Sequence, residues 1–310
     1  MSERPTLQQL RYFCALAETG HFRLAAERLG ITQPSLSLQI GKLEQVLGQR
    51  LVERGRSSVL TPVGREALAR ARDILQAVES LVEACDPAAQ GMPGTVRLGV
   101  SHTLGPYFLP HAVRLLHRRH PGLRLVIREA APRALIAGLQ EGLHDLVVTQ
   151  LPVGSADLVV RRLFREPLHL AVAREHLLAA RKTVTEADLA GLDVLTLGPD
   201  YMLHDQIGEL CRRVGAHLRQ DYEGTSLDAL RQMTAMNMGV TVLPALYLGS
   251  ENAGPDPDVR TLAFAGSGLW RSVGVAWRRS SGAQKRFDVI TDAAREVAAR
   301  DFRGVLTVEG

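Results

Sequence analysis

The sequence predicts an N-terminal all-α winged helix-turn-helix module with a long linker helix, followed by an α/β domain. Three observations predict this order. Three helical patterns closed by glycines fill residues 7–48. An apolar seam at alternating intervals of three and four follows over residues 68–85. Beyond residue 95, short Val- and Leu-rich runs alternate with helical segments, as in an open parallel sheet covered by helices.

The bulk composition is that of a globular protein with two or three domains. The chain has 310 residues, of which 45% are hydrophobic and 23% charged. We expect neither export nor a membrane span, because there is no charged-then-apolar leader and no run of 18 apolar residues. The cysteines, Cys14, Cys85 and Cys211, form neither a disulfide framework nor a zinc signature. A cytoplasmic location is therefore expected.

The positive charge is concentrated at the N-terminus. Residues 1–72 contain 11 Lys and Arg against 6 Asp and Glu, a net charge of +5. The rest contains 26 against 27, a net charge of −1, which recovers the total of +4. This imbalance weakly favours an acidic partner such as DNA for the N-terminal module.

The first two helices have local start and stop signals. Thr6 and Gln9 have the spacing of a capping box, and "FRLAAERLG" ends at Gly30. We interpret Cys14 as a small buried hydrophobe and not as a reactive thiol. The inward stripe of the first helix is expected to contain Leu7, Leu10, Phe13, Cys14 and Ala17.

The third helix, within "ITQPSLSLQIGKLEQVLG", is the candidate DNA-reading element. Thr32 or Gln33 should cap it, with Pro34 in its first turn and Gly48 at its end. Its buried stripe should be Leu36, Ile40, Leu43 and Leu47. The opposite face carries small polar groups that suit the major groove, although a solvated surface helix fits that face equally well. The outward residues are Ser35, Leu38, Gln39 and Lys42.

The following segment, "RLVERGRSSVLTPVG", favours the DNA-binding interpretation because it resembles a β-ribbon wing with two arginines near its tip. We expect base contacts from Gln33, Ser35, Ser37 and Leu38, the last through a thymine methyl group. Lys42, Arg54 and Arg56 should hold phosphates or the minor groove, and Thr32 and Gln39 complete the expected interface. The predicted boundaries are 1–61 for this module and 62–94 for the linker helix and hinge.

The linker helix should start at Thr61-Pro62 and run to about Ala84. One helix cannot bury its seam alone, so a second subunit is the economical partner, and palindromic DNA requires dimers in any case. The alternative is that the seam packs on the chain's own wing. The seam residues are Leu68, Ala71, Leu75, Val78, Val82 and Cys85.

Residues 95–305 should bind a ligand where the strands of the sheet end. Hydroxyl groups and free helix N–H groups converge there, which suits a small and anionic effector. Asp200 is expected to cap the helix within "GPDYMLHDQIGELC". His204 can gain a proton near neutral pH and strengthen anion binding. The expected effector-binding residues are Ser101, Thr103, Gln150, Met202, His204, Thr225 and Ser226.

Enzyme interpretations find little support. Ser101 and His102 are adjacent but lack the setting of a nucleophile elbow. His117 and His120 lie in "LLHRRHP", where a solvated basic face is favoured over a metal site. No "GKS" or "GKT" phosphate loop is present. We therefore expect no catalytic residues, no metal and no cofactor.

The segment "LRYFCALAETGHFRLAAERLGITQPSLSLQIGKLEQVLGQRLVERGRSSVLTPVG" closely resembles the N-terminal module of LysR-type transcriptional regulators. "GPYFLP", "GLHDLVV" and "MGVTVLP" resemble their effector domain. The resemblance implies a dimerising linker helix, a periplasmic-binding-protein-like two-lobed domain, a homotetramer built as a dimer of dimers, and RNA polymerase as a further partner. Lobe I would span about 95–164 and 269–305, and lobe II about 165–268. Arg23 replaces a small polar residue, so its helix would lack a cap and Arg23 would contact phosphate.

Within this family, "HTLGPYFLPH", "HDQIGELC" and "TSLDALRQM" resemble the peroxide-sensing, OxyR-like branch. Cys211 matches the second cysteine of that branch, but Met202 stands at the position of the reactive one and cannot form a disulfide. Pro132 and Asp221 also depart from its pocket, whereas Thr103 is retained. A small-molecule effector is thus the leading expectation, and oxidation of Cys211 or Met202 is the alternative.

Overall fold

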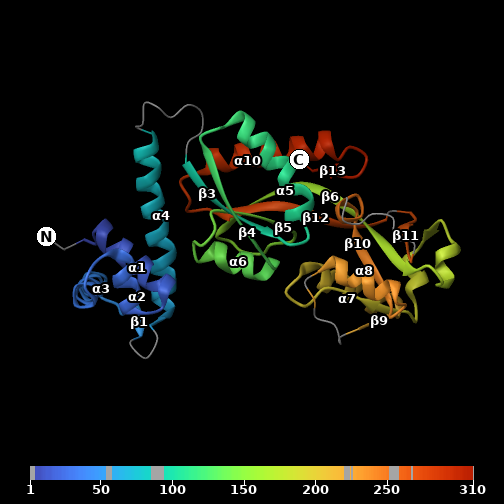
Figure 1. The fold of residues 1–310 in the computed structure, drawn as a ribbon, viewed down its shortest axis with the longest axis horizontal. Coiled ribbons are helices and arrows are strands. Elements are labelled where there is room, and N and C mark those ends of the chain that lie inside the picture. The colour runs from blue at the N-terminus through green and yellow to red at the C-terminus, as the bar shows by residue number, and fades with distance from the viewer. Residues whose placement is uncertain are drawn as a thin grey trace.

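The computed structural model describes residues 4–53, 58–84, 94–219, 224, 226–250, 258–266 and 268–309. An N-terminal helical module and a long helix, α4, lie beside a larger α/β part (Figure 1). Within the described ranges, no helix combines the length and apolar character needed to cross a bilayer.

The N-terminal module contains α1 (Leu7–Thr19), α2 (Phe22–Leu29) and α3 (Gln33–Leu47). The predicted capping box is confirmed, since Thr6 and Gln9 exchange side-chain and backbone hydrogen bonds. Thr32 caps α3 by accepting from the Ser35 N–H. Gly30 and Gly48 close their helices in the left-handed conformation that glycine adopts without strain.

The wing and the long helix complete this module. Strand β1 (Val52–Glu53) pairs antiparallel with β2 (Val59–Leu60), and α4 spans Pro62–Ala84. The Thr61 hydroxyl accepts from the Gly64 N–H at 2.9 Å. A Cβ atom on Gly64 would lie 2.1 Å from the Leu51 carbonyl oxygen, so glycine allows α4 to pack directly on the wing.

The predicted seam of α4 is divided between two surroundings. Leu68 and Ala71 are buried in the module's own core, and Leu75 packs against that core. This half of the seam thus packs within the chain's own N-terminal core, which is made mainly of α1 to α3 and includes Val52 of the wing, whereas the alternative had named the wing alone. Val82 of the predicted seam is exposed, and so are three apolar residues of the same helix outside the seam, Val63, Ile74 and Leu81. Leu47, predicted to be buried, is also exposed, because α3 reaches its last turn there and extends past the core.

Lobe I is a sheet between two helical layers. Strand β3 (Gly94–Ser101) lies parallel between β4 (Leu123–Ala130) and β5 (Leu146–Gln150). Helices α5 (Gly105–Arg119) and α10 (Gln284–Asp301) cover one face, and α6 (Pro132–Gln140) covers the other (Figure 1). Successive side chains of β5 point to opposite faces of the sheet, so the strand contributes to two cores. Val148 packs in the core beneath α5, and Val147 packs in the core beneath α6.

The sheet is mixed, which corrects the expectation of parallel strands only. Strands β6 (Leu158–Ala173) and β12 (Leu269–Arg278) pair antiparallel over most of their length, with a bulge between Val273 and Gly274. Both strands extend across the two lobes. Strand β6 leads the chain from lobe I into lobe II, and β12 leads it from lobe II back into lobe I. This return path makes the central pair antiparallel.

Lobe II has a core of its own, formed by buried residues between 168 and 269. Its strands are β7 (Thr183–Val184), β8 (Asp193–Leu195), β9 (His217–Leu218), β10 (Val240–Pro244) and β11 (Val259–Phe264). Its helices are α7 (Met202–Val214), α8 (Leu227–Ala235), α9 (Ala245–Leu248) and the short 3-10 turns Leu177–Ala180 and Glu186–Leu189. Strand β13 (Thr307–Val308) returns to β6 near the C-terminus.

Candidate functional site

The outward face of α3 is accessible along its length. Gln33, Ser35 and Lys42 are exposed, and the Leu38 side chain is 59% exposed. The hydroxyls of Thr32 and Ser35 lie 2.8 Å apart at the N-terminus of the helix. This end therefore presents small polar groups and one exposed apolar side chain, a combination that can contact base edges and a thymine methyl group.

Other predicted DNA contacts are less free or lie outside the described residues. Ser37 and Gln39 are half-buried, and Gln9 donates to Gln39 from α1. Helix α2 begins without a side-chain cap, and Arg23 in its first turn has a 78% exposed side chain 3.8 Å from Glu27. Arg54 and Arg56, with Cys85, Asp221 and Thr225, lie outside the described residues.

A buried polar cluster lies at the predicted crevice, where β3 ends and β12 begins. The hydroxyls of Ser101 and Thr103 lie 3.3 Å apart, and both residues are buried. Arg271 of β12 donates to the Thr103 hydroxyl at 2.8 Å and to its carbonyl oxygen at 3.0 Å. The structure thus brings two of the predicted effector residues together around an arginine that sequence reasoning missed.

The charge of Arg271 is compensated inside the protein. Its Nε donates to Glu166 at 2.7 Å, and both side chains are completely buried. Burial raises the pKa of the Glu166 carboxyl, while Arg271 and a hydrogen bond from the Leu246 N–H oppose that rise. The guanidinium in this cluster therefore carries no uncompensated positive charge.

Several contacts join lobe I to lobe II near this cluster. His102 and the Tyr201 hydroxyl are 2.9 Å apart. Gln150 donates to Gln206 of α7 at 2.9 Å. Arg133 of α6 forms a 2.9 Å ion pair with Asp205 of α7. These contacts tie the N-terminal turn of α7 to lobe I beside the cluster.

The first turn of α7 corrects one expectation. Its N-cap is Tyr201 and not Asp200, and no side chain caps it. Asp200 is exposed, and its carbonyl oxygen accepts from the Arg133 N–H, which places this residue one position before the cap. Met202 is the first helical residue and is half-buried. The uncapped turn leaves backbone N–H groups beside Met202.

The remaining predicted effector residues have local structural partners. His204 is hydrogen-bonded through Nδ1 to the Leu197 carbonyl oxygen at 2.7 Å. The Ser226 hydroxyl caps α8 by accepting from the Ala229 N–H. These contacts hold the first turns of α7 and α8 in place.

The two described cysteines are poor nucleophiles. Cys211 is buried in the core of lobe II, and burial raises its pKa. Burial also raises the pKa of Cys14 to about 11. A thiol reacts as its thiolate, so neither side chain is activated in this conformation. Among the described residues, no group of three His, Cys, Asp or Glu side chains has the arrangement of a metal site.

Comparisons with known proteins agree with this architecture. Residues 7–65 match the bacterial regulatory helix-turn-helix proteins of the lysR family, and residues 89–299 match the LysR substrate binding domain. The chain is 36% identical over 301 residues to the DNA-binding transcriptional dual regulator OxyR of Escherichia coli K12, covering 97% of this chain and 98% of that one. It is also 36% identical to a probable hydrogen peroxide-inducible genes activator of Streptomyces viridosporus, covering 96% of each.

Solved structures give the same result. Full-length OxyR from Pseudomonas aeruginosa with a cysteine-to-aspartate substitution matches with a TM-score of 0.79 and 31% identity, over 94% of this chain and 95% of that chain. Peroxide-bound OxyR from Corynebacterium glutamicum, with a cysteine-to-serine substitution, matches with a TM-score of 0.64 and 31% identity, over 96% and 93%. These relatives are transcription regulators and not enzymes. The chain belongs to the LysR family of DNA-binding transcriptional regulators.

Proposed function

We propose that this regulator responds to a small neutral oxidant, such as hydrogen peroxide, in the crevice between its lobes. The observation that carries the proposal is the complete burial of Arg271 against Glu166. Because this carboxylate already compensates the guanidinium, Arg271 offers an anionic effector no unpaired positive charge. The hydroxyls of the crevice can still bind a neutral hydrogen-bonding molecule. The names of the relatives point to the same signal.

Met202 is the proposed oxidisable group. It is half-buried at the start of α7, whereas Cys211 is enclosed in the core of lobe II. A thioether reacts without losing a proton: its sulfur lone pair attacks one peroxide oxygen, the O–O bond breaks, and the other oxygen leaves as water after proton transfer. The sulfur is oxidised to a sulfoxide and the peroxide is reduced.

The sulfoxide would change the crevice because it introduces a hydrogen-bond acceptor. The nearby N–H groups of the uncapped α7 turn can donate to that oxygen. Gln206 and Asp205 lie on the same helix and make the contacts with lobe I. A shift of this turn would therefore alter how the lobes close.

On the DNA side, we propose that α3 enters the major groove. Its exposed N-terminal groups would contact bases, Lys42 and Arg23 would contact phosphates, and the wing would extend the interface. A second copy of the chain would complete a palindromic reading unit. A cavity of about 520 Å³, lined by Leu7, Leu47, Val63 and Ile74 among others, supports such pairing because these side chains are exposed in one copy.

The test measures promoter binding of the full-length protein with and without hydrogen peroxide or hypochlorous acid. Wild type should change its footprint and gain one oxygen atom on the peptide containing Met202. Met202→Leu, which cannot form a sulfoxide, should bind DNA normally and lose the response, whereas Cys211→Ser should keep it. A response lost in Cys211→Ser but retained in Met202→Leu would make the cysteine the sensor. Unchanged binding with both oxidants in wild type would instead support a bound effector.

A further inference from the structure

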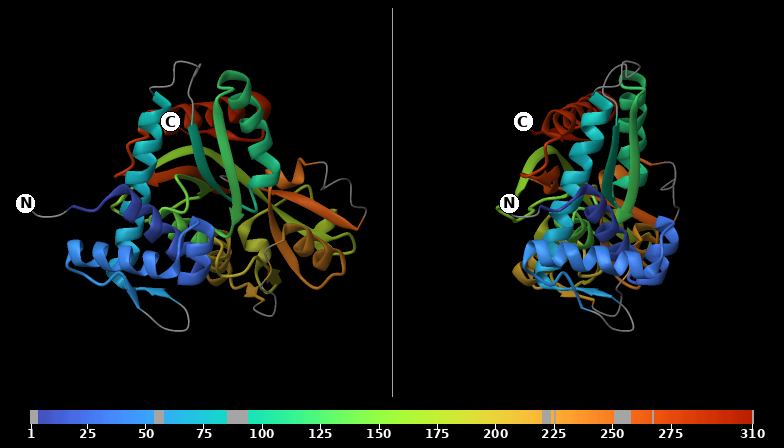
Figure 2. Two further views of the ribbon diagram at one scale, coloured as in Figure 1. Left: turned by 60° about the vertical axis from the view of Figure 1, so that its left-hand side comes forward. Right: turned by 90° about the vertical axis from the view of Figure 1, so that its left-hand side faces the viewer.

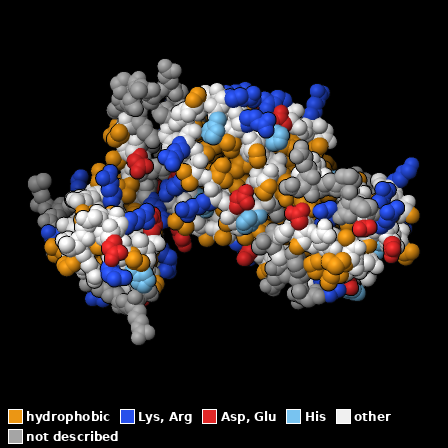
Figure 3. Space-filling view, in the orientation of Figure 1, with side chains coloured by type: hydrophobic (Ala, Val, Ile, Leu, Met, Phe, Trp, Pro, Cys, Tyr) orange, Lys and Arg blue, Asp and Glu red, His pale blue; other side chains and the backbone are white. Residues whose placement is uncertain are grey.

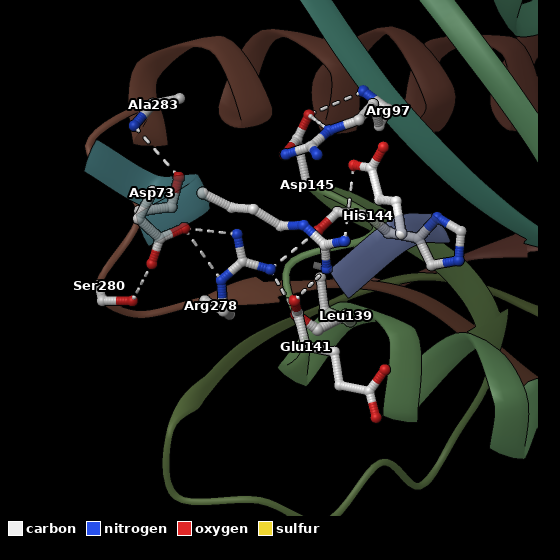
Figure 4. A network of polar contacts seen from close by, with 12 residues as sticks. Asp73, Arg97, Leu139, Glu141, His144, Asp145, Arg278, Ser280 and Ala283 are labelled. Carbon is white, nitrogen blue, oxygen red and sulfur yellow. Dashed lines mark hydrogen bonds and ion pairs between the residues drawn. The ribbon is translucent and has the colours of Figure 1, made fainter. Parts of the chain in front are cut away.

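The long helix α4 contacts lobe I through an ion pair between Asp73 and Arg278 (Figure 4). Asp73 of α4 accepts from Arg278 Nε at 3.2 Å and from its Nη2 at 2.6 Å. The two side chains are only 15% and 7% exposed. The second oxygen of Asp73 accepts from the Ser280 hydroxyl at 3.1 Å. Within the part of the chain that the structure describes, the Asp73 carboxylate thus accepts side-chain hydrogen bonds from lobe I alone.

Arg278 itself is fixed to lobe I. Its Nη1 donates to the carbonyl oxygens of Leu139 and His144, the latter at 2.9 Å. These carbonyls flank the turn between α6 and β5. Because Arg278 remains tied to its own lobe, the contact that can break when α4 moves is the one with Asp73.

A neighbouring residue reinforces the junction from α4. Arg72 is buried, and it donates to the Glu141 carbonyl oxygen at 2.7 Å while lying 3.7 Å from Glu18 of α1. A Cβ atom on Gly142 would approach the Arg72 side chain at 3.2 Å, so a glycine permits this close packing. Arg72 therefore links lobe I to the first helix of the DNA-binding module.

Both sides of the junction are rigidly connected to functional parts of the molecule. Leu68 and Ala71, on the turns of α4 before Asp73, are part of the core that supports α3. On the other side, β12 carries Arg271 in the crevice and Arg278 at the junction. One strand therefore joins the crevice to the surface on which α4 rests, and Figures 1 and 2 show α4 running alongside lobe I.

We propose that the Asp73–Arg278 pair is a releasable latch that sets the orientation of the DNA-binding module, and that β12 couples this latch to the crevice. A cavity of about 680 Å³ adjoins the pair and is lined by both residues with Glu66, Arg70, Asp157 and Ser280 among others. Lys and Arg side chains gather where the module meets lobe I (Figure 3). Water can enter from this side when the pair separates, which lowers the cost of exposing two charges.

The test uses amide hydrogen exchange of the full-length protein without any signal molecule, so its result does not depend on the proposed oxidant. Asp73→Asn keeps the shape of the side chain but removes its charge. It should accelerate exchange in residues 139–145 at least about tenfold, the factor that corresponds to 1.4 kcal/mol of opening free energy. Glu79→Gln, an exposed acid on the same helix, is the matched control and should change little.

A double-variant cycle separates the latch from general destabilisation. In an Arg278→Gln background, Asp73→Asn should have little further effect, and peptides of lobe II should exchange as in wild type. Additive effects, or unchanged exchange in Asp73→Asn, would overturn the latch. Glu166→Gln should accelerate exchange at residues 139–145 more than in α5 and α10, which cover the opposite face of the lobe I sheet. Equal acceleration throughout lobe I would reflect only the general loss of stability and would overturn the coupling through β12.

Discussion

Replacing Glu166 with glutamine should strongly destabilise the α/β part of the chain. The carboxylate accepts from Arg271 Nε and from the Leu246 N–H, each at 2.7 Å, through different oxygens. A glutamine has one carbonyl oxygen, so its NH2 group would face one of these donors. The substitution would also leave the Arg271 cation buried without a counter-ion. Removing one partner of such a pair costs about 3–5 kcal/mol.

The assay is urea unfolding followed by the signal of the α/β part, supported by thermal unfolding. A loss of that size corresponds to a Tm decrease of roughly 6–20 °C for a domain of this size. The matched control is Glu186→Gln, because Glu186 forms a partly exposed pair with Arg213 at 2.5 Å. Breaking that exposed pair should cost less than about 1 kcal/mol.

A second variant tests whether the buried charge is the cause. Glu166→Leu combined with Arg271→Met removes both charges and should be less destabilised than Glu166→Gln, since no ion remains unpaired. Two results would refute the reasoning. One is a Glu166→Gln protein as stable as wild type, and the other is a double variant whose loss equals the sum of the single losses.

Three further predictions concern other parts of the molecule. Ser37→Ala should weaken binding to cognate DNA by roughly 1–3 kcal/mol, while Lys42→Ala should mainly flatten the salt dependence of binding. A binding titration checks both variants, and equal losses on cognate and random DNA for Ser37→Ala would contradict a base contact. Ile74→Asp should lower the oligomeric state in light scattering, and an unchanged mass would exclude this helix face from the interface. Burial lowers the pKa of His144 and His169. The unfolded chain therefore binds more protons below pH 6.5, so stability should fall as pH decreases from there, by at most about 1.4 kcal/mol per pH unit for each histidine. Urea unfolding of the two His→Gln variants checks this, since each should reduce the dependence.

The N-terminal module was predictable because its signals are local. Thr6 and Gln9 are three residues apart, and Gly30 lies directly after the helix that it closes. Such signals act between neighbours in the chain, so a single sequence contains both partners. The mixed central sheet was not predictable in this way, because the direction of β6 against β12 depends on where the chain returns to lobe I.

The seam of α4 shows the limit of periodicity. Its spacing identifies residues that need an apolar partner but does not identify the partner. Leu68 and Ala71 find theirs in the core of their own module, and exposed Ile74 and Leu81 form the stripe that remains for another surface. Which stripe faces inward depends on how α4 packs on the rest of the module, and Gly64 allows the close approach of α4 to Leu51.

The crevice shows a limit of a different kind. Hydroxyl groups and helix N-termini attract any hydrogen-bond acceptor, whether charged or neutral, so the sequence pattern alone favoured an anion. The choice between these ligands depends on the net charge around Thr103, and Arg271 contributes to it together with Glu166, which lies 105 positions earlier in the chain. A single inward-facing arginine would have argued for an anion. The same arginine neutralised by a buried carboxylate argues for a neutral molecule. Oxidation of the Met202 thioether by a neutral oxidant fits this argument, because the reaction requires no ionised side chain.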